Sequence, residues 1–320
     1  MVYILLIAGF ICLVKGADFF VSGSSAIAKH FNIPSFVIGL TIVAFGTSLP
    51  EAAVSVTAAL KGANGIAVGN VLGSNMFNLL VVLGASSLIK SCPVSKSVLK
   101  FEYPLSIAAA AVIAIMCIGT GSNALLLSRY DGIILLAIFV FFIFWTVKSV
   151  LKSRLELPDC DDSDETDESP MSPIKGAVLA VVGAAGIIIG GDIVVDSATK
   201  IASDFGLDQT LIGLTIVAMG TSLPELVTSV VAALKGETDI AVGNVIGSNL
   251  FNLLFVLGIS VTIHPIKATM FSIYDCIILI AVSLIILIPL AKKKELTRMW
   301  GILLLVLYAS YLAYIIMRTM

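Results

Sequence analysis

The sequence predicts an all-α polytopic membrane protein, in which ten transmembrane helices form two inverted-topology repeats of five helices each. Of the 320 residues, 58% are hydrophobic and 12% are charged, whereas soluble domains carry about 25% charged residues. Ten mainly apolar segments are long enough to cross a bilayer, which takes about 20 residues. A polar block also recurs 174 positions along the chain, from residues 46–51 to residues 220–225.

Polar or Pro/Gly-marked breaks separate the predicted helices. The N-terminal apolar run has no basic residue before it, so we expect it to stay as the first helix and not to be cleaved as a signal peptide. The predicted helices span residues 2–28, 33–60, 65–89, 101–119, 126–150, 174–202, 207–234, 239–263, 269–291 and 297–317.

The longest break divides the chain into two halves. Residues 1–151 are the first predicted repeat and residues 174–320 the second, with an acidic cytoplasmic linker at 152–173 between them. Residues 156–170 read ELPDCDDSDETDESP, and this lack of apolar residues favours a disordered tether. A low-affinity calcium sensor is the alternative, although the stretch lacks the glycine turn of an ordered calcium loop.

Basic residues are distributed unevenly between the two faces of the predicted bundle. Thirteen lysines and arginines fall in loops on the face opposite the N-terminus and five on the N-terminal face. Because basic loops stay in the cytoplasm, we expect a multi-pass protein of the plasma membrane with both termini extracellular and the central loop cytoplasmic. One more lysine, Lys15, lies well inside the first helix, with Asp18 as its nearer candidate partner. Asp18 and its counterpart Asp192 stay open between helix-end structure and a gating role.

The repeat and the helix count together imply a geometry. Because each half has an odd number of helices, the second half enters the membrane from the side opposite to the first. Similar sequences in opposite orientations form an inverted-topology repeat, which is typical of secondary transporters with a binding site at the bilayer midplane.

Both copies of the repeated block read GTSLPE, and each puts a glutamate in the middle of an apolar segment. A carboxylate at membrane depth is costly and marks a functional site by default. In the first copy, Pro50 has no N–H for the carbonyl of Gly46, so we expect a kink that leaves carbonyls near Ala44 to Gly46 without partners. Such carbonyls are tolerated at this depth where they line a cavity, and they suit hard cations such as calcium and sodium.

Oxygen-bearing side chains accompany both glutamates at helical spacing. Residues four positions apart share one face of a helix, and a second polar block on the next helix repeats this spacing. The two sets are Thr47, Glu51 and Ser55 with Asn70, Ser74 and Asn78, and Thr221, Glu225 and Ser229 with Asn244, Ser248 and Asn252.

These sets predict one central cluster with two carboxylates and many neutral oxygens. Because the motifs contain no His or Cys, a site for zinc or copper is disfavoured. A structural role competes with this interpretation, since single hydroxyls in membrane helices usually bond their own backbone. It fits Ser55, Ser229, Asn70 and Asn244 better than the glutamates, which could themselves be protonated or paired with a lysine.

The paired GTSLPE blocks, with the paired blocks of form GN-x-x-GSN-x-x-N at 69–78 and 243–252, resemble the alpha repeats of the cation/calcium exchanger superfamily. The closest likeness is to prokaryotic sodium/calcium exchangers. The motifs cover about residues 39–84 and 213–258, and the ten-helix layout extends the resemblance to the whole chain.

The resemblance implies a set of ligands for calcium and sodium at the centre of the bundle. It also implies that the first and sixth helices slide across the core to change access. The implied ligands are Glu51, Glu225, Thr47, Ser48, Ser74, Asn78, Thr221, Ser222, Ser248 and Asn252, with the backbone oxygens of Ala44 and Ala218.

The chain departs from some relatives of this superfamily at two positions. Where those relatives carry an aspartate, this chain has Asn78 or Asn252, so the central cluster has two carboxylates and not three. The resemblance therefore leaves the ion stoichiometry open and argues against potassium co-transport.

The function implied is a sodium/calcium antiporter, not an enzyme, that exports calcium by alternating access to a midplane site. A calcium/proton antiporter is the nearest alternative, because protons can compete for two carboxylates in a poorly hydrated cavity. A cation channel is less favoured, since channels usually have symmetric subunits around a pore. An intramembrane hydrolase lacks support, because neither HExxH nor GxSxG occurs.

The remaining expectations concern partners. Calcium and sodium are expected as transported ions rather than cofactors, the lipid bilayer is the surrounding partner, and one chain is expected to be sufficient for transport. A net charge of −2 suggests no nucleic-acid partner. The five cysteines are scattered and form neither a disulfide framework nor a metal-ligand spacing.

Overall fold

The computed structural model describes residues 1–62, 64–94, 96–119, 125–156, 171–205 and 218–319. Within these residues, eight helices are long and apolar enough to cross a membrane, and a bent pair makes a ninth span. The remaining predicted helix, 207–234, is described only from residue 218 onward. Most of the predicted linker, 152–173, also lies outside the described residues.

The first half holds five predicted spans in the expected order, and π-helical turns interrupt two of them. Its elements are α1 (Val2–His30), α2 (Ser35–Ile38), η1 (Gly39–Val43), α3 (Ala44–Thr47), α4 (Leu49–Leu60), α5 (Asn64–Phe77), η2 (Asn78–Val82), α6 (Leu83–Ile89), β1 (Cys92–Pro93), α7 (Lys96–Lys100), α8 (Glu102–Ile118), β2 (Leu126–Leu127) and α9 (Arg129–Glu156).

The second half repeats this order, with its own π-helical turn at the position that matches η2. Its described elements are α10 (Pro173–Asp204), α12 (Ala218–Gly220), α13 (Leu223–Leu234), α14 (Thr238–Leu250), η5 (Phe251–Val256), α15 (Leu257–Ile263), β3 (Ile266–Lys267), α16 (Met270–Lys293), β4 (Glu295–Leu296) and α17 (Arg298–Thr319).

The kink predicted at the first GTSLPE block is present. The segments Ser35–Thr47 and Leu49–Leu60 meet at 48°, and Pro50 lies in the first turn of α4, where its missing N–H costs the helix nothing. For Ala44, the expectation of an unpartnered carbonyl is wrong, because this carbonyl accepts a hydrogen bond from the N–H of Ser48 at 3.1 Å. Pro50 removes only its own N–H, so the bond from Ser48 survives.

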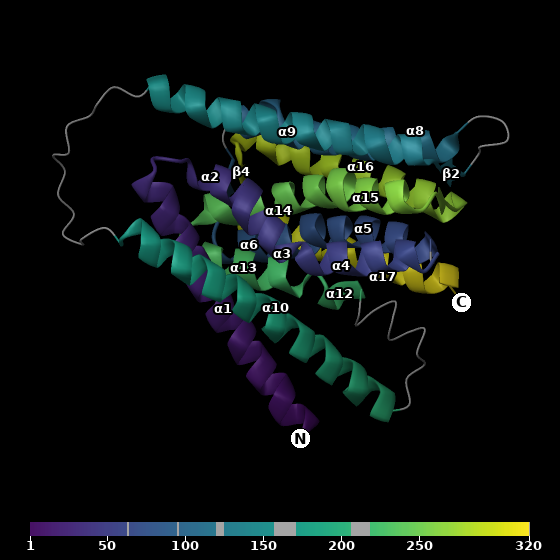
Figure 1. Ribbon diagram of the computed structural model, residues 1–320, viewed down its shortest axis with the longest axis horizontal. Helices are drawn as coiled ribbons and strands as arrows, with labels where there is room; N and C mark the ends of the chain where they lie inside the picture. Colours follow the sequence, from purple (N-terminus) through teal and green to yellow (C-terminus); the bar gives the residue numbers. More distant parts are fainter. Residues whose placement is uncertain (63, 95, 120–124, 157–170, 206–217, 320) are drawn as a thin grey trace.

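The two helices that carry the asparagine blocks form the centre of the bundle. In the most apolar stretches of Ile66–Ile89 and Thr238–Ile263, 72% and 78% of the residues are buried, against 22% in Arg129–Ser149. Figure 1 shows α14 and α15 among the other long helices, with α9 along one edge of the bundle. The polar blocks are therefore enclosed by protein, which their composition requires at membrane depth.

The helices α1 and α10 form a separate crossing pair, slanted against the rest of the bundle (Figure 1). Glycines recur every seven residues along their contact, at Gly9, Gly16 and Gly23 of α1 and at Gly183 and Gly190 of α10. A Cβ atom added at Gly16, Gly23, Gly183 or Gly190 would overlap backbone atoms of the other helix. The two backbones therefore touch directly, a close approach that small residues permit in membrane helix pairs.

Two short antiparallel ladders modify the predicted all-α class. The strand β1 pairs with β4, and β2 pairs with β3, each over two residues. Each ladder joins a loop of one half to a loop of the other, and Figure 1 places β4 and β2 toward opposite ends of the molecule. This exchange between the halves agrees with an inverted repeat.

Candidate cation site

The carboxylates of Glu51 and Glu225 lie in the centre of the bundle, and each is held by a serine of the other half. Ser222 donates to Oε1 of Glu51 at 2.9 Å, and Ser48 donates to Oε1 of Glu225 at 2.7 Å. All four side chains are fully buried. Each serine immediately precedes the leucine and proline that open α4 or α13. The side chains at these two helix starts therefore link the two repeats.

A second hydroxyl approaches each carboxylate from the following helix. Ser74 of α5 lies 3.5 Å from Oε1 of Glu51, and Ser248 of α14 lies 3.4 Å from Oε1 of Glu225. The oxygens of Ser222 and Ser74 are also within 3.0 Å of each other. Both carboxylates are therefore surrounded by hydroxyls from two helices, as the sequence predicts.

The asparagines at the start of the second block contact the backbone of the glutamates. Asn70 donates to the backbone oxygen of Glu51 at 3.3 Å and to Ser55 at 3.0 Å. The matching Asn244 donates to the backbone of Glu225 at 3.4 Å and to Ser229 at 2.9 Å. These contacts fit the structural interpretation of the four side chains Asn70, Ser55, Asn244 and Ser229.

The two threonines of the GTSLPE blocks also reach across to the other half. Thr47 donates to Oδ1 of Asn244 at 3.0 Å, and Thr221 donates to Oδ1 of Asn70 at 3.4 Å. Each half therefore orients an asparagine of the other. Thr47 also lies 3.4 Å from the backbone oxygen of Ala44.

Two residues that the sequence argument did not select, Asn75 and Asn249, also join the two halves. Asn78 donates to Oδ1 of Asn249 at 3.2 Å, and Asn252 donates to Oδ1 of Asn75 at 3.3 Å. Both residues belong to the repeated GSN sequence, so their exact duplication in the two blocks was a signal available from the sequence alone.

Four buried oxygens of the cluster have no hydrogen-bond partner among the described residues. They are Oε2 of Glu51, Oε2 of Glu225, Oδ1 of Asn78 and Oδ1 of Asn252. All four are acceptors, and they form two pairs related by the repeat. Since buried polar atoms are normally paired, a ligand that supplies positive charge, not another acceptor, would satisfy this set.

The electrostatics of the cluster also favour a cation. The charges of Glu51 and Glu225 repel each other, and neither glutamate forms an ion pair with a lysine or arginine of the described residues. No cluster of three or more His, Cys, Asp or Glu side chains occurs in the described part of the chain. Hard cations bind carboxylate, hydroxyl, amide and carbonyl oxygens, which is the donor set present.

The predicted site residues thus fall into one cluster, with two points of difference. In the second half, the N–H of Ser222 bonds to the carbonyl of Met219 at 3.2 Å and not to that of Ala218, unlike the matching bond to Ala44. The predicted pairing of Asp18 with Lys15 is wrong, because Oδ1 of Asp18 lies 2.7 Å from Nζ of Lys235. The repeat brings this lysine to Asp18 from the other half of the chain.

Comparison with known proteins places the chain among ion exchangers. The family model described as "Sodium/calcium exchanger protein" matches residues 1–148 and 175–317. The sodium/calcium exchanger MaX1 of Methanosarcina acetivorans is 32% identical over 339 residues, covering 97% of each chain. The inner membrane protein YrbG of Escherichia coli is 40% identical over 265 residues, covering 82% of this chain and 79% of its own.

A solved structure of the sodium–calcium exchanger NCX_Mj, soaked with sodium and calcium, superimposes with a TM-score of 0.83. It is 34% identical, and the match covers 98% of this chain and 97% of that one. MaX1 and NCX_Mj are transporters, so the expectation that the chain is not an enzyme is confirmed. The chain is a multi-pass membrane protein that belongs to the sodium/calcium exchanger protein family.

Proposed function

We propose that the chain exports calcium in exchange for sodium, by alternating access to one site at the centre of the bundle. The observation that carries this proposal is the set of four unpartnered buried acceptors on Glu51, Glu225, Asn78 and Asn252. This set of acceptors, duplicated by the repeat, suits a bound cation, because no lysine or arginine of the described residues pairs with the two glutamates. The names of MaX1 and NCX_Mj support calcium and sodium as the ions exchanged.

The proposed ligands come from both repeats. Glu51 and Glu225 supply charge, and the hydroxyls and amides around them supply the neutral oxygens that a dehydrated ion needs. The remaining ligands proposed are Thr47, Ser48, Ser74, Asn78, Thr221, Ser222, Ser248 and Asn252, with the backbone oxygens of Ala44 and Ala218.

Charge balance gives the coupling. One calcium ion neutralises the two carboxylates, and so do two sodium ions, whereas a third sodium ion leaves the site positive. If both kinds of ion use Glu51 and Glu225, they cannot occupy the site fully at the same time. Mutual exclusion and alternating access to a midplane site together produce antiport without any covalent chemistry.

Sodium is favoured over a proton as the counter-ion by the composition of the site. A proton needs only a carboxylate, but a sodium ion needs several oxygens, and hydroxyls approach both glutamates within 3.5 Å. A calcium/proton antiporter is the second candidate, because the two buried carboxylates have no cationic partner among the described residues.

We also propose the arrangement in the plasma membrane that the basic loops predict, with both termini outside. Residues 1–151 and 174–320 are then the two inverted repeats, joined by a cytoplasmic tether at 152–173. One chain contains the whole cluster, so a monomer is sufficient for transport in this proposal.

The experiment that tests the proposal measures counter-ion dependence. Purified protein in tight liposomes loaded with sodium is diluted into sodium-free medium with labelled calcium. We expect calcium uptake that requires internal sodium and stops when sodium is equal on both sides. Acid should slow this uptake, because protonating Glu51 or Glu225 removes the charge that both cations need.

Two other results would overturn the sodium proposal. Calcium entry driven equally well by a pH gradient without sodium would establish the proton antiporter instead. Calcium leak that depends on no counter-ion would point to a channel. If more than two sodium ions leave per calcium ion, the uptake should also respond to the membrane potential.

A further inference from the structure

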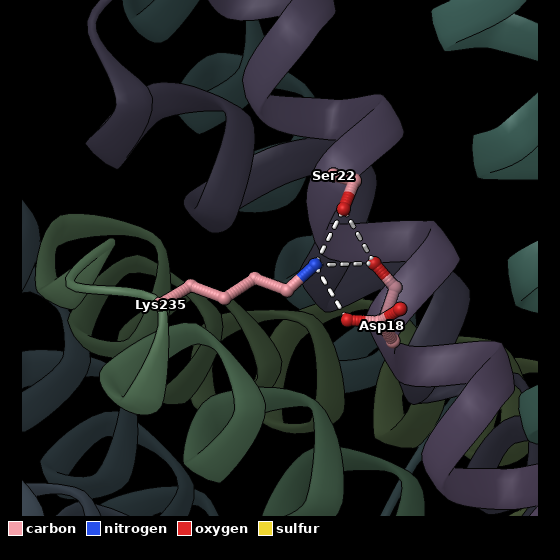
Figure 2. A network of polar contacts seen from close by, with 3 residues as sticks. All are labelled: Asp18, Ser22 and Lys235. Carbon is pink, nitrogen blue, oxygen red and sulfur yellow. Dashed lines mark hydrogen bonds and ion pairs between the residues drawn. The ribbon is translucent and has the colours of Figure 1, made fainter.

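A polar contact outside the cation site ties α1 to the end of α13 (Figure 2). Nζ of Lys235 lies 2.7 Å from Oδ1 of Asp18 and donates to the backbone oxygen of Asp18 at 2.9 Å and to Oγ of Ser22. Two residues further on, Glu237 accepts a hydrogen bond from Ser25 at 2.6 Å. One face of α1 is therefore bound to the turn that follows α13.

The positions that the repeat relates to this contact carry matching chemistry but are not joined. By the offset of 174 residues, Lys235 corresponds to Lys61, Asp18 to Asp192 and Ser22 to Asp196. Lys61, Asp192 and Asp196 are all exposed, and Lys61 forms no ion pair within the described chain. By the same offset Ser25 corresponds to Thr199, whose Oγ1 is buried without a partner in the described part of the chain.

Only the contact set of Lys235 and Asp18 is formed in the present arrangement. Backbone contact through Gly16 and Gly183 joins α10 closely to α1, so a movement of one helix would carry the other with it. In the present arrangement α1 packs against α13, and α10 has no comparable packing against α4 among the described residues. Moving the pair toward α4 would separate Asp18 from Lys235 and bring Asp192 toward Lys61.

We propose that Lys235 with Asp18 and Ser22 is a latch that holds the α1–α10 pair in the present state, and that Lys61 with Asp192 and Asp196 is the equivalent latch of the oppositely open state. The proposal rests on the alternating access of the proposed function and adds the residues that position the moving pair. The two latches lie near the ends of α13 and α4, which the inverted topology places on opposite sides of the membrane. Each latch therefore forms when its own side is closed.

The experiment compares the reactivity of two cysteines that the repeat relates, Ile66→Cys and Ile240→Cys. Ile66 is 58% exposed and Ile240 is 0% exposed. The two residues lie near the starts of α5 and α14, which the proposed inverted topology puts on opposite sides of the membrane. Each cysteine is placed in a full-length chain in which the native residues Cys12, Cys92, Cys117, Cys160 and Cys276 are replaced. The protein is held in nanodiscs, where a hydrophilic maleimide reaches both faces, and the ratio of the two labelling rates is measured.

We expect opposite effects from removing the two lysines. Lys235→Met should slow labelling at position 66 and speed it at position 240, while Lys61→Met should do the reverse. The change in the ratio should be roughly two- to fivefold, the range that a partly exposed ion pair can shift in a two-state equilibrium. The double exchange of Asp18→Lys with Lys235→Asp should restore the original ratio.

A matched control lies on the same helix as Asp18. Lys15 is exposed and forms no ion pair with any described residue, so Lys15→Met should leave the ratio unchanged. The proposal is overturned if Lys235→Met does not change the ratio, or if Lys61→Met changes it in the same direction as Lys235→Met. The latter would mark both lysines as ordinary supports of the fold.

The proposed function is tested separately by the liposome assay on the unsubstituted chain. A chain that exchanges calcium for protons would fail that assay and still show opposite labelling shifts. A chain that exchanges calcium for sodium but shows no labelling shift would support the proposed function and contradict the latch.

Discussion

The two repeats carry almost the same polar blocks, but their asparagine helices are packed differently. In α14, a Cβ added at Gly243 would overlap backbone atoms of α2 and η1. A Cβ added at Gly247 would overlap the backbone of Leu40 in η1. In α5, no described residue comes within 4 Å of a Cβ at Gly69 or Gly73. The same sequence thus forms a tight helix contact in one half and leaves a glycine surface uncovered by the described residues in the other.

This difference extends to the cation site. Asn244 is completely buried and Asn70 is 9% exposed, although both hold the backbone of a glutamate. The site is therefore closed more tightly at the α14 end than at the α5 end. In the orientation proposed from the basic loops, the α5 end would face the outside, and this arrangement would be the one more accessible from the extracellular face.

The largest expected effect comes from neutralising either central glutamate, and here the two halves should respond alike. Glu51→Gln and Glu225→Gln should each abolish calcium uptake into sodium-loaded liposomes, because each removes half of the charge of the site and a strong calcium ligand. The measurement is uptake by protein whose gel-filtration profile matches the unsubstituted chain. Robust calcium flux in either folded variant would contradict the assignment of that carboxylate.

The next effect should differ between the halves. Gly247→Ala forces a methyl group against the carbonyl of Leu40, and we expect a loss of about 1–3 kcal/mol of stability, the usual cost of overpacking. Gly73→Ala should leave the thermal unfolding midpoint unchanged and slow exchange, if α5 packs in the opposite state as α14 does here. The stability of both variants is measured by thermal unfolding in detergent. An equal loss in both would contradict the difference in packing between α14 and α5.

A smaller effect is expected where the halves cross at the asparagines. Asn249→Ala removes the acceptor that orients Asn78, so the amide of Asn78 should bind the ion less well. We expect the calcium concentration for half-maximal uptake to rise by roughly tenfold, the cost of about one lost hydrogen bond to a buried group. Asn75→Ala should have the same effect through Asn252, and unchanged uptake in both variants would make this pair a packing feature only.

The smallest effect should come from the segment between the halves. Replacing residues 159–168 with a Gly/Ser linker of equal length should leave transport largely intact, because a tether supplies no ligand to the central site. Uptake is measured against the calcium concentration at the cytoplasmic face. A large shift in that dependence would instead favour the calcium-sensor alternative.

Local features of the fold could be read from the sequence because they depend on neighbouring residues. Apolar length predicts the spans, and Pro50 predicts the bend near Ser48, since a proline acts on its own turn of helix. The repeat of 46–51 at 220–225 predicts that two glutamates share one site. The four two-residue strands were missed, because pairing in a ladder depends on a partner far along the chain.

The sequence by itself therefore determined the family and most of the spans, and it singled out the two glutamates. The tertiary structure decided which contacts form within a half and which form between the halves. A serine beside each glutamate could bond its own half, but Ser222 donates to Glu51 and Ser48 to Glu225. Likewise, Asp18 forms an ion pair with Lys235 and not with the nearby Lys15. With two nearly identical blocks, the contacts within a half and between halves look alike in sequence, and only the packing of the helices brings one set within bonding distance.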